Sequence, residues 1–124
     1  MKIRDIMTCT AVSVGAEENV EVAARTLHRY NIGALPVCGA DGKVCGMVTD
    51  RDLVLRCLAA GKVPGQTTVR DVMTRQVVTV TPDTGVEEAR ILMGQRQIRR
   101  LPVTENGKLC GIVSLGDLTA CKPV

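Results

Sequence analysis

Aromatic side chains are almost absent from this sequence. Of its 124 residues, Tyr30 is the single aromatic one, and there is no Trp and no Phe. Proteins that bind single-stranded nucleic acids usually stack the bases on aromatic rings. The formal net charge is only +3 with both signs mixed along the chain, which is too weak to indicate nucleic-acid binding. The composition therefore argues against a nucleic-acid partner.

Long apolar runs are also missing. No run approaches the length that spans a bilayer, so we expect no transmembrane helix and no membrane partner. The first residues, Met1–Asp5, lack the apolar stretch of a secretory signal peptide. We therefore expect a cytoplasmic location.

The sequence also lacks catalytic and metal-binding patterns. His28 is the only histidine, and the chain contains no HExxH pair, no Walker loop and no Gly-x-Ser-x-Gly. An enzyme needs an activated nucleophile, a carboxylate pair in a cleft or a metal. We expect no enzymatic activity, no catalytic residues, no metal site and no required cofactor.

Cysteine is present, but none of the six stands in a Cys-x-x-Cys pair. Buried cysteine behaves as a small apolar side chain, and three of the six lie in apolar runs that are typical of strands. We therefore expect structural thiols, with a redox or metal role as the alternative. The six are Cys9, Cys38, Cys45, Cys57, Cys110 and Cys121.

An internal repeat is the strongest signal in the sequence. The segment Ile3–Thr8 returns as Val69–Thr74, and Gly42–Thr49 returns as Gly107–Ser114. Between the two copies lies a stretch rich in Gly and Pro, which is typical of a linker. We assign the first repeat to residues 1–60, the linker to residues 61–66 and the second repeat to residues 67–124.

Each repeat predicts the same order of elements. A short amphipathic turn leads to a short strand, a helix with apolar residues at helical spacing, two strands joined by a turn, and a final helix. Thr84 and Glu87 have the spacing of a capping box, and the final helices begin near Asp50 and Leu115. The sequence predicts an α/β (α+β) fold of two β-α-β-β-α repeats, packed through their sheets about a pseudo-two-fold axis.

The motifs in this order are specific in combination. Leu35-Pro36-Val37 returns as Leu101-Pro102-Val103, and the Gly-x-Val-Thr-x-x-Asp of Gly46–Asp52 returns with Ser in Gly111–Asp117. Over essentially its whole length the chain resembles a tandem pair of CBS domains, a Bateman module. The resemblance implies a homodimeric regulatory module that binds AMP, ADP, ATP, an NAD-type ligand or S-adenosylmethionine.

Two pairs of residues stand where a strand ends and a helix begins: Thr49 with Asp52, and Ser114 with Asp117. Free N–H groups at a helix start suit phosphate, the hydroxyl can donate to a phosphate oxygen, and the carboxylate can accept both hydroxyls of a ribose. The alternative is structural, since Thr or Ser is a common N-cap and Asp in the first turn favours the helix dipole.

The resemblance implies two clefts, each of which joins residues of both repeats. Apolar members of each cleft would form a slot for a flat base. The first cleft comprises Thr49, Arg51, Asp52, Met73, Thr74, Val78, Ile98 and Arg100. The second comprises Ser114, Asp117, Met7, Thr8, Val12, Ile32 and Gly33.

The two clefts differ in charge. Arg99 and Arg100 occupy the positions that Gly33 and Ala34 occupy in the first repeat. Arginine binds phosphate through a forked set of donors. We therefore assign Arg100, with Arg99 and Arg51 nearby, to the phosphates of a nucleotide and expect the first cleft to be the tighter one. The alternative is that these arginines only solvate a strand end, with Arg99 pointing outward.

The sequence thus predicts a regulator whose ligand shifts a population of conformations that an unknown partner protein reads. Two alternatives stay open. One is a ligand-free assembly or redox-responsive module that uses the cysteines, and the other is a CBS protein that binds nucleic acid.

Overall fold

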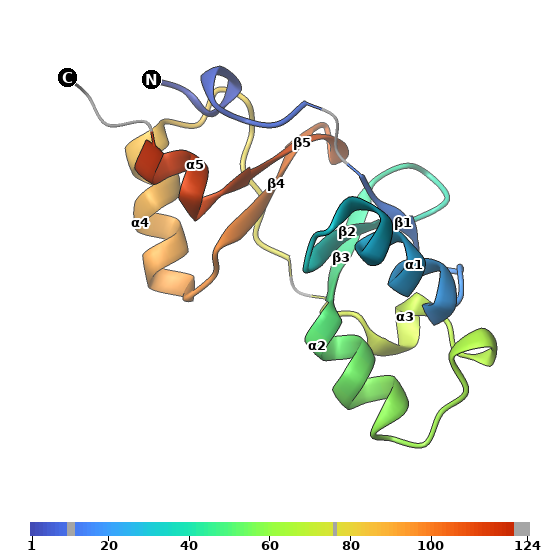
Figure 1. Cartoon of the computed structure of the whole chain (residues 1–124). Helices are drawn as coiled ribbons and strands as arrows, with labels where there is room; N and C mark the ends of the chain where they lie inside the picture. Colours follow the sequence, from blue (N-terminus) through green and yellow to red (C-terminus); the bar gives the residue numbers. More distant parts are fainter. Residues whose placement is uncertain (10–11, 76, 121–124) are drawn as a thin grey trace. The chain divides into compact units, whose positions relative to one another are not determined.

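The computed structural model describes residues 1–9, 12–75 and 77–120. The chain divides into two compact units, and each has its own apolar core. One unit runs from Val12 to Val77, and the other combines Met1–Ala11 with Val78–Val124. Both units contain helices and strands (Figure 1), so the predicted mixed α/β class is confirmed.

The unit Val12–Val77 is built on a three-stranded sheet with the order β1-β2-β3. β1 pairs with β2 in parallel, and β2 pairs with β3 antiparallel. β3 runs directly into α2, which continues as the π-helix η2. The elements are β1 (Val14–Gly15), α1 (Val20–Tyr30), β2 (Ala34–Cys38), β3 (Val44–Thr49), α2 (Asp50–Leu53), η2 (Val54–Leu58), η3 (Pro64–Gln66) and α3 (Val69–Val72).

Helix α1 forms where the apolar spacing predicts it. Val20, Ala23 and Leu27 are buried on one face of the helix and belong to the core of this unit. The side chain of Asn19 accepts a hydrogen bond of 3.1 Å from an N–H of the first turn, which satisfies a donor that the helix itself leaves free. Asn31 ends the helix in the left-handed conformation with φ 52°, a conformation that Asn tolerates better than most residues.

The other unit combines the turn η1 with a two-stranded antiparallel sheet, β4 and β5, and two helices. Val86, Ala89 and Met93 are buried on one face of α4 and share a core with Leu101 and Leu118. The elements are η1 (Ile3–Asp5), α4 (Val86–Arg96), β4 (Arg100–Glu105), β5 (Lys108–Ser114) and α5 (Leu115–Ala120).

The first turn of each repeat packs into the core formed by the other repeat. Val69 and Val72 of α3 are fully buried in the core of the first repeat, and Ile3 of η1 is fully buried in the core of the second. The backbone contacts match: Ile3 N donates to Thr84 O at 2.9 Å, and Val69 N donates to Glu18 O at 2.8 Å. Each core is therefore completed by a turn that its own repeat does not supply.

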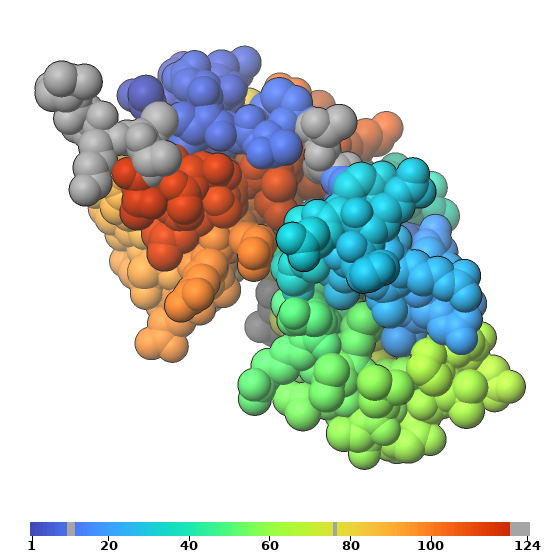
Figure 2. Space-filling view, viewed as in Figure 1, coloured from blue at the N-terminus to red at the C-terminus, as the bar shows by residue number. Residues whose placement is uncertain are grey.

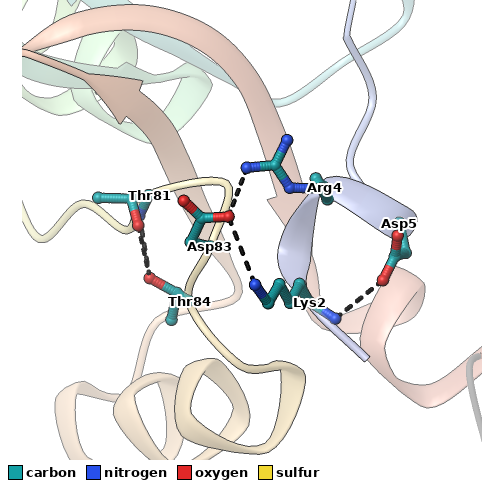
Figure 3. Close-up of polar contacts among 6 residues, drawn as sticks. All are labelled: Lys2, Arg4, Asp5, Thr81, Asp83 and Thr84. Atoms are coloured by element: carbon teal, nitrogen blue, oxygen red, sulfur yellow. Dashed lines mark hydrogen bonds and ion pairs between the residues drawn. The ribbon is translucent and has the colours of Figure 1, made fainter.

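A cluster of polar side chains holds η1 against the turn that precedes α4 (Figure 3). Arg4 hydrogen-bonds to Asp83, and Lys2 Nζ lies 3.7 Å from the same carboxylate. This bond with Arg4 lowers the pKa of Asp83 and raises the pKa of Arg4. The unit Val12–Val77 has the equivalent contact, in which Arg70 Nε donates to Glu17 at 2.6 Å.

The charge of Asp83 makes stability depend on pH. Because its pKa in the folded state lies below the ordinary value of 3.8, its contribution is present above that value and is lost as pH falls through the folded pKa. We expect Asp83→Asn to lower the urea midpoint slightly at about pH 7, less in high salt because both partners are exposed. The difference from the native chain should vanish at strongly acidic pH, and an undiminished difference there would contradict the ion-pair assignment.

The predicted capping box of Thr84 and Glu87 is wrong. Gly85 is the N-cap of α4 and provides no side-chain hydrogen bond. The Thr84 hydroxyl instead accepts from Thr81 N at 3.1 Å and lies 3.2 Å from the Thr81 hydroxyl (Figure 3), because it closes the turn before the helix. Glu87 pairs with Arg90 on the same helix.

The short strand predicted before the middle helix forms in the first repeat but shrinks to one bridge in the second, between Val80 and Val103. In the first repeat, Ala16 N continues the pairing by donating to Cys38 O at 3.0 Å. Pro82 takes the position of Ala16 in the second repeat. The pairing stops there because proline has no backbone N–H to donate.

Candidate functional site

The junction between β3 and α2 is a reciprocal capping box. Asp52 N donates to Thr49 Oγ1 at 3.1 Å, and Thr49 N donates to Asp52 Oδ2 at 2.9 Å. Ser114 and Asp117 make the same two bonds between β5 and α5, at 3.1 and 2.8 Å. The structural interpretation of these residues as helix caps is therefore confirmed. The same bonds hold both carboxylates in a fixed position, so capping does not exclude ligand binding.

The carboxylate of Asp52 has acceptor capacity left for a ligand. Its side chain is only 15% exposed, and Oδ1 lies 3.8 Å from Arg56 Nε. Oδ2 accepts the hydrogen bond from Thr49 N. Because an ionised carboxylate can accept about four hydrogen bonds, one or two hydroxyl groups could still bind to it.

Arg56 belongs to this site, although the sequence interpretation missed it. Its Nη1 donates to the carbonyl oxygens of Val72 and Met73 at 3.3 and 3.2 Å, while its Nε faces Asp52. One signal was available, since Arg56 follows Asp52 by four residues and this spacing places opposite charges on one helix face. The contact with Val72 and Met73 is tertiary, so no local pattern could have predicted it.

Thr74 is tied to β3 by two backbone hydrogen bonds. Met47 N donates to Thr74 O at 3.0 Å, and Thr74 N donates to Met47 O at 2.8 Å. Gly46 permits this approach, because a Cβ at that position would lie only 2.8 Å from Thr74 O. The bridge brings Met73 and Thr74 to the strand that ends at Thr49.

The other unit contains the equivalent bridge. Thr8 N donates to Ile112 O at 3.0 Å, and Ile112 N donates to Thr8 O at 3.1 Å. Thr8 and its neighbour Met7 are thereby held against β5, the strand that ends at Ser114. Four predicted members of the second cleft therefore lie in one unit. They are Met7, Thr8, Ser114 and Asp117.

Arg100 lies opposite Ser114 in the register of β4 and β5. Arg99 O accepts a hydrogen bond from Leu115 N at 2.7 Å, and both arginine side chains are exposed. Arg51, in the other unit, is exposed in the first turn of α2. A phosphate site with Thr49 would need residues of both units, so it stays a prediction. Its arginines would be Arg99, Arg100 and Arg51.

The remaining predicted residues are four apolar side chains and one glycine. Val78 and Ile98 pack, partly buried, against the core of one unit, and Val12 packs against the core of the other. Ile32 is exposed directly after α1, and Gly33 O accepts from Asp50 N at 3.0 Å. Their role as a slot for a base stays a prediction.

The described cysteines are free thiols. Burial raises the pKa of Cys38 and of Cys110, which disfavours the reactive thiolate at neutral pH. Cys57 is completely buried in the core. These environments favour structural roles, whereas Cys9 is exposed and Cys121 lies outside the described residues.

The single histidine, His28, is exposed on α1. Within residues 1–9, 12–75 and 77–120, no three side chains of His, Cys, Asp or Glu gather where they could hold a metal ion. In this described part of the chain, every helix is too short or too polar to cross a membrane.

Comparison with known sequences identifies the repeat. The family model of the CBS domain matches residues 3–58 and 69–122. YlbB, an uncharacterised protein of Bacillus subtilis, is 46% identical over 119 residues, which cover 95% of this chain and 80% of YlbB. Hypoxic response protein 1 of Mycobacterium tuberculosis is 37% identical over 120 residues, which cover 97% of this chain and 84% of that protein.

Solved structures agree with the sequence comparison. A crystal structure of hypoxic response protein I with two coordinated zinc ions has a TM-score of 0.91 and 36% identity, covering 99% of this chain and 100% of the other. The CBS domain pair of protein MJ0100, in complex with 5′-methylthioadenosine and S-adenosylmethionine, has a TM-score of 0.84 and 28% identity, covering 97% and 98%. CBS-pair proteins are generally regulatory modules, and no enzyme family is indicated. The chain therefore belongs to the CBS domain family and contains a tandem pair of CBS domains, as the sequence predicts.

Proposed function

We propose that this CBS pair is a regulatory module that binds an adenine nucleotide at Thr49 and Asp52 and catalyses no reaction. The observation that carries the proposal is the nearly buried carboxylate of Asp52, which the capping box holds in place with acceptor capacity to spare. A ribose offers two adjacent hydroxyls, and a carboxylate can accept a hydrogen bond from each. AMP, ADP, ATP and NAD all carry such a ribose.

The hydroxyl of Thr49 complements this carboxylate. Its oxygen accepts from Asp52 N, and among the described residues its own hydrogen is donated to none. A hydroxyl can donate and accept at once, so Thr49 can donate to a ligand oxygen without loss of the cap. Ser114 has the same arrangement with Asp117, which supports a second site of the same kind.

The relatives support the adenosine part of the proposal. The CBS pair of MJ0100 was solved with 5′-methylthioadenosine and S-adenosylmethionine, and both ligands contain adenosine. S-adenosylmethionine is therefore the alternative ligand for this chain. In either case the ligand acts as a regulatory signal, and the chain requires no cofactor.

The proposal includes the full clefts and the way they signal. Residues 1–60 and 67–124 form the repeats, residues 61–66 link them, and each cleft draws on both. Ligand binding shifts the population of conformations, and an as yet unknown partner protein reads the change. The described cysteines are free thiols, most of them partly or fully buried, which fits the reducing conditions of the cytoplasm, where we place the protein.

A homodimer is part of the proposal because η2, which lies in the green surface segment of Figure 2, exposes apolar side chains. Val54, Leu55 and Leu58 are each about half exposed, and burial of apolar surface is the main driving force for association. We expect Leu55→Glu to weaken self-association at least about tenfold in sedimentation equilibrium. Ile91→Glu on α4, where the native side chain is equally exposed, is the control and should leave the association unchanged. A native chain that is monomeric throughout would refute the dimer.

Calorimetric titration of the full chain with AMP, ADP, ATP, NAD, S-adenosylmethionine and adenosine tests the proposed ligand. We expect binding of at least one adenine nucleotide. Binding of none of these compounds would overturn the proposal and favour a ligand-free assembly. A change in gel mobility after oxidation would then indicate the redox module, and salt-sensitive binding to RNA or DNA would indicate the nucleic-acid alternative.

A further inference from the structure

A cleft of about 430 Å³ in the unit Val12–Val77 is lined by three arginines and a single carboxylate. The cleft lies next to the bridge that ties Thr74 to β3, so it adjoins the Asp52 site without any residue of the other unit. Its lining consists of Arg56, Arg70, Asp71, Met73, Thr74 and Arg75.

Arg56 is held in place by two of its nitrogens, which leaves the third free for a ligand. Nε faces Asp52, and Nη1 donates to the carbonyl oxygens of Val72 and Met73. Among the described residues, Nη2 donates to none. A guanidinium that is held on two sides loses little additional entropy when its remaining donors bind a ligand.

The other two arginines add further N–H donors to the cleft. Arg70 uses Nε for Glu17, and no described residue accepts a bond from its terminal nitrogens. Arg75 is exposed, and no described residue forms an ion pair or hydrogen bond with its side chain. Asp71, Glu17 beside Arg70 and Asp52 beside Arg56 balance the three positive charges, so what the cleft offers a ligand is unused guanidinium N–H donors and not a net positive charge.

The fold itself does not require this set of arginines. In the repeat alignment, Arg75 corresponds to Cys9 and Arg56 corresponds to Cys121, whereas Thr74 corresponds to Thr8. The bridge of Thr8 with β5 nevertheless forms with the same backbone hydrogen bonds as the bridge of Thr74. Two of the three arginines are thus specific to one repeat and are not needed to build the bridge.

We infer that the cleft of Arg56, Arg70 and Arg75 binds phosphoryl groups. If the phosphoryl groups belong to a nucleotide whose ribose is held by Asp52, the inference rests on the proposed function. Free pyrophosphate is the other ligand with the same chemistry. Arginine matches phosphate oxygens through its forked donors. The site at Thr49 and Asp52 therefore prefers ADP over adenosine, and over S-adenosylmethionine, which has no phosphate.

Calorimetry of the full chain with ADP, adenosine and inorganic pyrophosphate tests the inference. We expect Arg75→Gln to weaken the binding of ADP and of pyrophosphate about tenfold, a usual effect of losing one charged hydrogen bond, and to leave adenosine binding within about twofold. Arg29→Gln makes the same change of charge on the exposed end of α1 in the same unit and should alter none of the three affinities. Arg56→Lys keeps the charge but loses the fork, and should also weaken ADP.

The outcomes separate this inference from the proposed function. If Asp52→Ala abolishes ADP binding while Arg75→Gln leaves both ADP and pyrophosphate unaffected, the nucleotide site stands and the arginine cleft is refuted. If pyrophosphate binds and is weakened by Arg75→Gln, but no adenosine compound binds, the cleft stands and the proposed function fails. If Arg75→Gln and Arg29→Gln lose the same affinity for ADP and pyrophosphate, the loss comes from the net charge of the chain, and the inference is overturned.

Discussion

Replacement of Asp52 by Ala is expected to weaken the binding of AMP about thirtyfold, because a hydrogen bond to a charged group contributes about 1.5–3 kcal/mol. In the proposed site the carboxylate accepts hydrogen bonds from the ribose hydroxyls, and the bond from Thr49 N holds it in position. An analogue of AMP that lacks the 2′-hydroxyl should bind the native chain more weakly. The affinities of the native chain and of Asp52→Ala should then differ less for this analogue than for AMP.

The same substitution also removes one of the two bonds of the capping box, the one from Thr49 N to the carboxylate, which costs about 1 kcal/mol of folding stability. Asp117→Ala is the matched control, because Asp117 makes the same two capping bonds in the other unit. We expect equal losses in the free energy of unfolding for the two variants, but a large loss at the tighter binding site only for Asp52→Ala. If calorimetry shows the same affinities for the native chain and for Asp52→Ala, the ribose assignment is wrong.

Gly46→Ala is expected to lower the free energy of unfolding by about 2 kcal/mol, a usual cost of overpacking. An added Cβ would lie 2.6 Å from Met73 Sδ and 2.8 Å from Thr74 O. The methionine side chain can move, but Thr74 O belongs to a backbone bridge and can move only if the bridge opens. We therefore expect the variant to bind nucleotide more weakly as well, since Met73 and Thr74 border the site. Urea unfolding and calorimetry would measure the two effects.

Two glycines serve as controls for this prediction. Gly111 is the counterpart of Gly46, with Thr8 O at 2.8 Å from an added Cβ, so Gly111→Ala should cost a similar amount of stability. Gly94 lies within α4 with no atom within 4 Å of an added Cβ, and Gly94→Ala should stabilise the chain by up to about 1 kcal/mol. A neutral Gly46→Ala beside a stabilising Gly94→Ala would contradict the close approach of Thr74 to β3.

The candidate site shows which features local sequence patterns can predict and which they cannot. The spacing of Thr49 and Asp52 indicates both a helix cap and a ligand group, and the structure shows the cap directly. Arg56 escaped notice because its partners at Val72 and Met73 come from another part of the chain. Thr84 has the spacing of a cap as well, but a neighbouring turn competes for its hydroxyl, and sequence spacing does not reveal such competition.

By itself the sequence determined the duplication, the family, and most of the helices and strands of each repeat. These follow from which residues recur and from apolar spacing, because burial of one face leaves a period that can be read directly. Apolar spacing predicts that a side chain is buried, but it does not predict which residues the side chain packs against. Only the tertiary structure decided that Ile3 completes the core of the second repeat and Val69 that of the first, because contacts between distant segments depend on how the whole chain packs.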